Sequence, residues 1–102
     1  MTNVDAPVSR QAGARILAAA LFAAAARHPD AGVTQRMRCL AACTALRCPT
    51  APVPPLHDGP GPDDLIAQAL RTLGELDHAA FAHPDVLAAA RHGRRALTAA
   101  SS

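Results

Sequence analysis

The chain has 102 residues and a formal net charge of +2, and alanine supplies 26 of the residues behind its apolar fraction of 50%. This length fits a single domain, and so small a net charge does not by itself indicate a nucleic-acid-binding protein. With two phenylalanines and no tyrosine or tryptophan, the core must be thin, because each buried methylene contributes only about 0.8 kcal/mol. We therefore expect the chain to associate with another protein or with itself as a homodimer.

Residues 1–8 are predicted to form a flexible arm, and Ser9 is a suitable N-cap for a first helix that ends near Arg27. The segment 16–26 of this helix carries no charge. Two interpretations remain open: a helix buried within a bundle of a cytoplasmic protein, or the apolar core of a secretory signal peptide cleaved near Ala26. The odd number of cysteines, three, favours reduced thiols in the cytoplasm. The segment is too short to span a bilayer, which needs about 20 apolar residues.

A second helix is predicted from Asp30 or Thr34 to Cys48, where a proline follows. Its hydrophobic positions recur with helical spacing and form one stripe, made of Val33, Met37, Leu40 and Thr44. Residues 49–62 contain six prolines and two glycines, a density that neither a helix nor a central strand tolerates. We interpret 49–62 as a semi-extended linker.

The third helix has the clearest signals. Pro62 suits its first position, and Asp63 and Asp64 place negative charge against the positive end of the helix dipole. Gly74 within this helix is expected to permit the close approach of a neighbour. A fourth helix is predicted to begin at Pro84. The apolar face of the third helix consists of Leu65, Ile66, Ala69, Leu70, Leu73, Leu76 and Ala80.

These elements predict an all-α protein, a small antiparallel bundle of four helices arranged as two hairpins joined by the Pro-rich linker. The hairpins comprise residues 9–48 and 63–100, within one helical domain of residues 9–102. No stretch shows the sustained alternation with β-branched residues that is typical of a strand.

The tripeptide His-Pro-Asp occurs at 28–30 and again at 83–85, each time between two predicted helices. Internal duplication and chance repetition both remain open as explanations. The segment 28–46 resembles the signature loop and third helix of J-domain co-chaperones, which would imply a co-chaperone role for this loop. The resemblance covers under a fifth of the chain. The helix before the loop is nearly uncharged here and strongly basic in that family, so membership does not follow.

Cys39 and Cys43 lie four residues apart on the second helix, and Cys48 and His57 follow in the sequence. Three thiols and an imidazole are ligands of the kind found in tetrahedral zinc sites, although the usual paired C-x₂-C spacing is missing. The commonest role of buried cysteine, packing as a small apolar side chain, is the interpretation we favour, and a redox-sensing disulfide is a further alternative.

None of the familiar catalytic motifs is present in the sequence. We expect an interaction or regulatory module without catalytic activity. A metal- or thiol-responsive protein is the alternative, and a small secreted protein is a further one. The residues predicted to contact a partner are Ile66, Leu70 and Leu73 on the third helix and the basic residues Arg91, Arg94 and Arg95 on the fourth.

Overall fold

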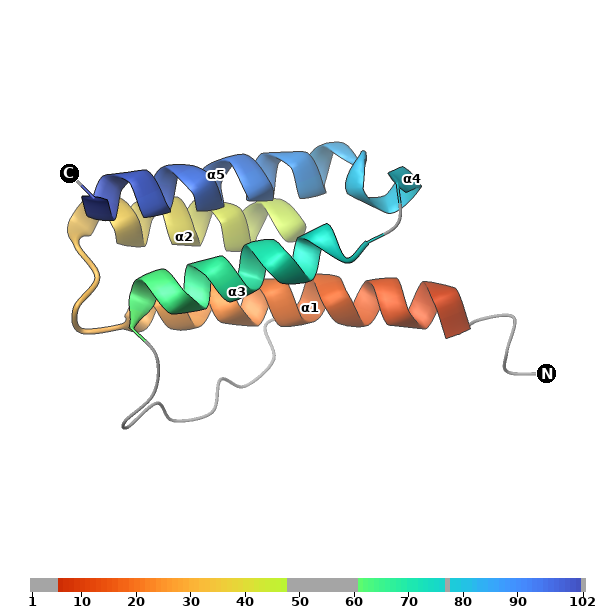
Figure 1. Cartoon of the computed structure of the whole chain (residues 1–102), viewed down its shortest axis with the longest axis horizontal. Helices are drawn as coiled ribbons and strands as arrows, with labels where there is room; N and C mark the ends of the chain where they lie inside the picture. The colour runs from red at the N-terminus through yellow and green to blue at the C-terminus, as the bar shows by residue number, and fades with distance from the viewer. Residues whose placement is uncertain (1–5, 48–60, 77, 102) are drawn as a thin grey trace.

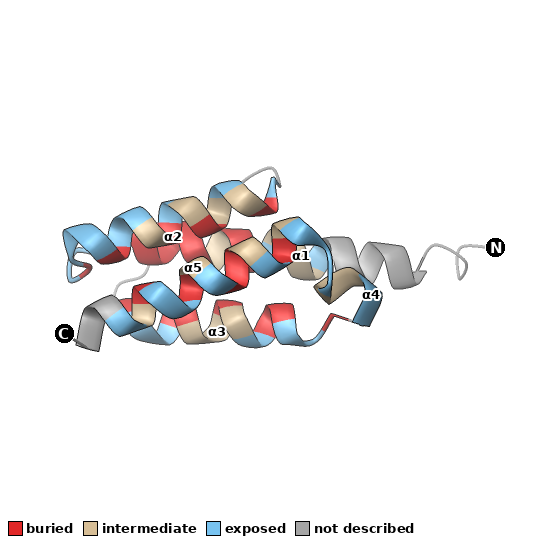
Figure 2. Ribbon diagram, turned by 90° about the horizontal axis from the view of Figure 1, so that it is seen from above, coloured by how far each residue is buried: buried red, intermediate tan, exposed pale blue. Residues whose placement is uncertain are grey.

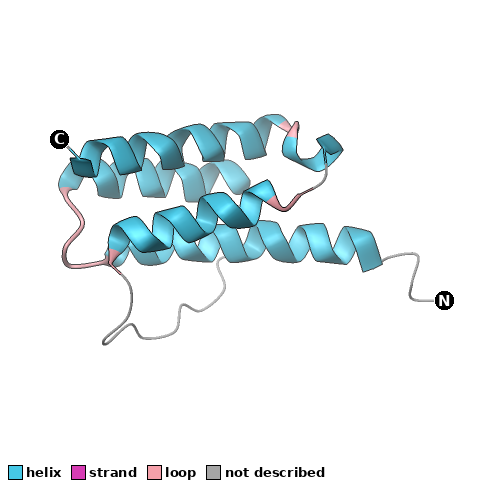
Figure 3. Cartoon of the chain, viewed as in Figure 1, coloured by secondary structure: helices cyan, strands magenta, loops and turns pink. Residues whose placement is uncertain are grey.

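The computed structural model describes residues 6–47, 61–76 and 78–101, and all regular secondary structure within these ranges is helical (Figure 3). The all-α prediction is therefore confirmed. The helices are α1 (Ala6–Arg27), α2 (Val33–Leu46), α3 (Pro62–Gly74), the single turn α4 (His78–Phe81) and α5 (Pro84–Ser101).

The four long helices form a closed bundle in which each helix has two neighbours (Figure 1). Helix α1 packs against α2 and α3, and α5 packs against the same two helices. Helices α1 and α5 run in one direction and α2 and α3 in the other (Figure 1). All adjacent pairs are therefore antiparallel, while α1 and α5, like α2 and α3, are related diagonally. The predicted hairpins are present as α1–α2 and α3–α5.

The diagonal relation of α2 and α3 explains why their connection is long. Because these helices run in the same direction, the end of α2 and the start of α3 lie at opposite ends of the bundle (Figure 1). The connection must cover the 14 residues of α2, about 21 Å of helix. At about 3.3 Å for each extended residue, this takes at least six or seven residues. The predicted linker 49–62 lies outside the described residues up to position 60, and Gly61 and Pro62 are the N-cap and first residue of α3.

Three helix boundaries differ from the prediction. Helix α1 begins at Ala6 rather than Ser9, which is possible because a proline in the first turn, here Pro7, costs no helical hydrogen bond. Helix α2 ends at Leu46 rather than Cys48, and Arg47 follows it with a left-handed backbone, φ 52°. Helix α3 ends at Gly74 instead of continuing to Ala80.

Both His-Pro-Asp tripeptides lie between two helices and contain the same short-range hydrogen bond. The Nδ1 atom of His28 accepts a hydrogen bond from the backbone N–H of Asp30 at 3.1 Å, and His83 accepts one from Asp85 at 3.2 Å. Helix α5 begins directly at the second tripeptide, whereas α2 begins at Val33, three residues after the first. The two tripeptides thus share a local hydrogen bond, which at the second one lies at the first turn of α5.

The core is built from alanine with a few larger side chains (Figure 2). Its largest member is Phe22 of α1, which reaches across the bundle to Gly93 of α5. A Cβ atom at position 93 would lie 2.9 Å from the Phe22 ring and 2.9 Å from Leu70 of α3. Gly93 therefore permits the close approach that the sequence analysis assigned to Gly74, where a Cβ would meet nothing within 4 Å.

We predict that Gly93→Ala destabilises the fold by about 1–2 kcal/mol, because crowding of the Phe22 ring outweighs the better helix propensity of alanine. Gly13→Ala is the matched control. Position 13 also lies within a helix, but a Cβ there meets nothing within 4 Å, so this substitution should stabilise by about 0.5–1 kcal/mol. Urea unfolding measures both changes, and stabilisation by both would show that the Phe22 contact is loose.

Candidate partner-binding surface

Helix α2 presents three large apolar side chains to solvent, while its last one, Leu46, is buried. The exposed fractions are 76% for Val33, 65% for Met37 and 55% for Leu40, and Thr44 continues the same stripe as an exposed residue. An apolar stripe on an amphipathic helix normally faces the core, and here it faces outward. We call Val33, Met37 and Leu40 the α2 ridge.

The inward face of α2 combines small and polar residues with one large apolar side chain, Leu46. Its buried members are Gln35, Cys39, Ala42 and Leu46. The short side chains Cys39 and Ala42 leave room for α1 and α5 to pack closely on α2. Gln35 is held inward because its Nε2 atom donates to the Asp63 carboxylate at 2.8 Å and to the Ala96 carbonyl at 3.3 Å. This polar anchor fixes which face of α2 is buried.

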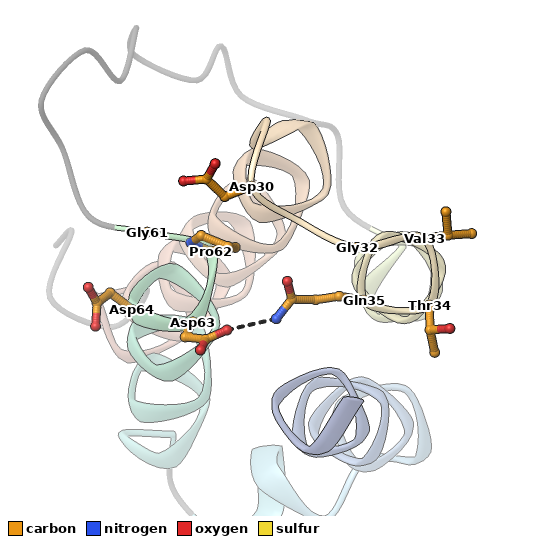
Figure 4. Close-up of a pocket in the computed structure, with 9 residues that line it drawn as sticks. All are labelled: Asp30, Gly32, Val33, Thr34, Gln35, Gly61, Pro62, Asp63 and Asp64. Carbon is orange, nitrogen blue, oxygen red and sulfur yellow. Dashed lines mark hydrogen bonds between the residues drawn. The ribbon is translucent and has the colours of Figure 1, made fainter. Parts of the chain in front are cut away.

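The Gln35–Asp63 hydrogen bond forms the floor of an open pocket where α2 and α3 begin (Figure 4). Asp30 and Asp64 also line this pocket, whereas the Val33 side chain points away from it (Figure 4). Within the described ranges, no group of three or more histidine, cysteine or acidic side chains is placed to hold a metal ion. The buried polar side chain of this pocket is Gln35, which already makes two hydrogen bonds within the protein. We therefore assign Gln35 a structural role.

The predicted partner face on α3 belongs instead to the core of the chain. Ile66 and Leu73 are fully buried, and Leu70 is half-buried and lies against position 93. The physical reason is that α3 sits between α1 and α5, so its apolar face is covered on both sides. In the folded chain these three residues therefore do not form an open surface, and their contact with a partner stays a prediction.

The predicted basic residues Arg91, Arg94 and Arg95 are exposed on α5. Because α5 packs along α2, Arg38 of α2 joins this surface and acts electrostatically on His92. We call Arg38, Arg91 and Arg95, whose positive charges act on His92, the arginine cluster. Burial lowers the pKa of His92, and the positive charges of Arg38, Arg95 and Arg91 lower it further.

The predicted zinc ligands divide into two groups. Cys39 is fully buried as a free thiol, and burial raises its pKa to about 11. Cys43 is half-buried on the same helix. Cys48 and His57 lie outside the described residues. Because a zinc-bound cysteine must be a thiolate, the environment of Cys39 favours the packing role, and zinc binding stays a prediction.

A scan of protein-family models and searches of curated proteins and solved structures give no significant match to this chain. Among the described helices, none combines the length and the apolar character needed to cross a lipid bilayer.

We predict that Arg38→Gln raises the pKa of His92, because loss of a nearby positive charge makes the imidazolium less unfavourable. Arg71→Gln removes the same charge from α3, at a position that is not among the charges lowering the pKa of His92, and should leave the His92 titration unchanged. NMR titration of the histidine ring protons measures both. Equal shifts in the two variants would contradict a local effect.

For the cysteines, we predict that Cys39→Ser lowers the free energy of unfolding by about 1 kcal/mol, because a hydroxyl replaces a buried thiol. Cys43→Ser should cost less, since that side chain is only half-buried. Helical content, measured by circular dichroism, should be unchanged in both. Unfolding of the wild-type protein by a metal chelator, reversed by zinc, would instead support the metal site.

Proposed function

We propose that this chain is a protein–protein interaction module without catalytic activity, which binds an amphipathic helix of another protein on the α2 ridge. One observation carries the proposal. The three side chains of the ridge are more than half exposed, in a chain whose core is built largely from alanine. Apolar patches exposed in this way mark contact sites on soluble proteins.

The energetic argument compares the two faces of α2. Fully burying a valine, leucine or methionine side chain contributes about 1.5–3 kcal/mol. Because the ridge side chains are more than half exposed, they do not give the monomer this full stabilisation. The smaller Cys39 and Ala42 lie on the inward face instead. A partner that covers Val33, Met37 and Leu40 would recover it.

The geometry suits a helical partner. Val33, Met37 and Leu40 follow the i, i+4, i+7 spacing of one helix face, and from first to last they extend over about 10 Å. Two turns of a partner helix cover this length, and helix recognition commonly uses anchors with this spacing. Met37 at the centre has a flexible side chain that adapts to the shape of a partner.

A cytoplasmic location is part of this proposal. Cleavage near Ala26, as in the secreted alternative, would remove most of α1, including Phe22. Since α1 packs against both α2 and α3, its loss would expose the buried residues Ile66 and Leu73. The contacts of α1 therefore support retention of the segment.

To test the proposal, the full chain is used to select binders from a displayed library of amphipathic helical peptides. In these peptides the apolar positions are randomised, and every position at the edge of the apolar face is glutamine. We expect binders whose affinity falls at least about tenfold for Met37→Gln combined with Leu40→Gln. Leu17→Gln is the control, because Leu17 is 52% exposed but lies on α1, and it should bind normally.

Two results would overturn the proposal. One is the absence of binders, or binders that do not distinguish the ridge variant from the control. The other is a stable homodimer, seen by sedimentation, that dissociates in the ridge variant, because the occupant of the ridge would then be a second copy. Circular dichroism of each variant checks that these exposed substitutions leave the helices intact.

A further inference from the structure

The arginine cluster has no acidic counterpart within the described part of the chain. No described carboxylate lies within 4.0 Å of the guanidinium groups of Arg38, Arg91 or Arg95. By contrast, Arg15 and Arg47 each form an ion pair with Asp85, at 3.8 Å and 4.0 Å. Arg15 and Arg47 thus share a carboxylate where α1, α2 and α5 meet, while the cluster is left with uncompensated charge.

The side chain of His92, on which the cluster acts, is also incompletely satisfied. The Nδ1 atom of His92 is buried and has no hydrogen-bond partner. The positive charges of the three arginines disfavour protonation of the His92 ring. The cluster therefore combines positive charge that no described carboxylate pairs with and a buried ring nitrogen without a hydrogen-bond partner.

Position along the bundle connects the cluster to the α2 ridge. Arg38 is half-buried on α2, one residue after Met37 of the ridge, and its charge acts on His92 of α5, the helix that packs along α2. Arg36 and Arg47 belong to the same helix or its C-cap, and α2 itself contains no acidic residue. A helix lying on the ridge would therefore meet positive charge along its edges.

We propose that the arginine cluster is the carboxylate-binding part of the α2 docking surface, so that the partner is an amphipathic helix with aspartate or glutamate along one edge. This inference rests on the proposed function. Arginine suits the role because its planar guanidinium group binds a carboxylate through two parallel hydrogen bonds. A second copy of this chain does not fit, because it would bring an arginine-bearing α2 against another one.

The experiment starts from the best glutamine-edged peptide of the library described above. Two versions are made with the same apolar face, one with glutamate and one with lysine at the edge positions. Fluorescence anisotropy then measures their affinity for the full chain at about 50 mM and 500 mM NaCl. The variants are Arg38→Gln and, as a control with the same change in charge, Arg71→Gln.

We expect the glutamate version to bind about tenfold more tightly than the glutamine parent at low salt, and the lysine version more weakly, with both differences shrinking at high salt. Arg38→Gln should weaken the glutamate version about two- to fivefold and leave the parent unchanged. Arg71→Gln should change neither. Binding of the glutamate version should also raise the pKa of His92 in an NMR titration, since a carboxylate stabilises the imidazolium.

The outcomes separate the two proposals. If the parent binds on the ridge but glutamate edges give no advantage, or Arg38→Gln and Arg71→Gln act alike, the acidic partner is wrong and the docking surface stands. If no peptide binds the ridge, the proposed function fails together with the inference. An unchanged His92 pKa on binding of the glutamate peptide would place its carboxylates away from the cluster and overturn the inference.

Discussion

The contact of Phe22 with Gly93 is the constraint on which the rest of the bundle depends. It joins α1 and α5, which are diagonal partners and do not share a hairpin, and Leu70 of α3 closes the same space. Because the ring occupies the volume where a side chain at position 93 would otherwise lie, these three helices come close together. At such separations, the remaining interior is filled well by small side chains, and alanine predominates among the buried residues.

The same close packing determines what α2 can bury. Its inward face carries Cys39 and Ala42, which fit between α1 and α5, together with Gln35, which finds its hydrogen-bond partners on α3 and α5. The larger Val33, Met37 and Leu40 are then left outside. Leu46 at the end of the helix is buried all the same, so α2 divides its large apolar side chains between the core and the ridge, and the ridge supplies the apolar surface that we assign to a partner.

Local chemistry made the helix starts predictable, whereas features that depend on neighbouring helices were not. Pro62 and Pro84 begin helices as expected, because the preference of proline for the first turn needs no tertiary contact. Helical spacing identified the apolar stripe on α2 but not whether it faces the core or solvent. That depends on which side chains fit against α1 and α5. The role of Gly93 was likewise hidden, since it depends on the ring opposite. The same reasoning treated Ile66, Leu70 and Leu73 as an open surface, because the sequence does not show that α3 is enclosed on both sides.

The way α5 distributes its packing bears on how the chain folds. Helix α5 contacts α2 more extensively than its own hairpin partner α3, and α1 makes extensive contacts with α3 in the other half. Most of the stabilising area thus lies between the hairpins, in contacts between residues far apart in sequence. We therefore expect the two halves to unfold together as one cooperative unit. Contacts between the hairpins also give this helical protein a higher contact order than a bundle whose helices pack chiefly against their sequence neighbours, and a higher contact order predicts slower folding.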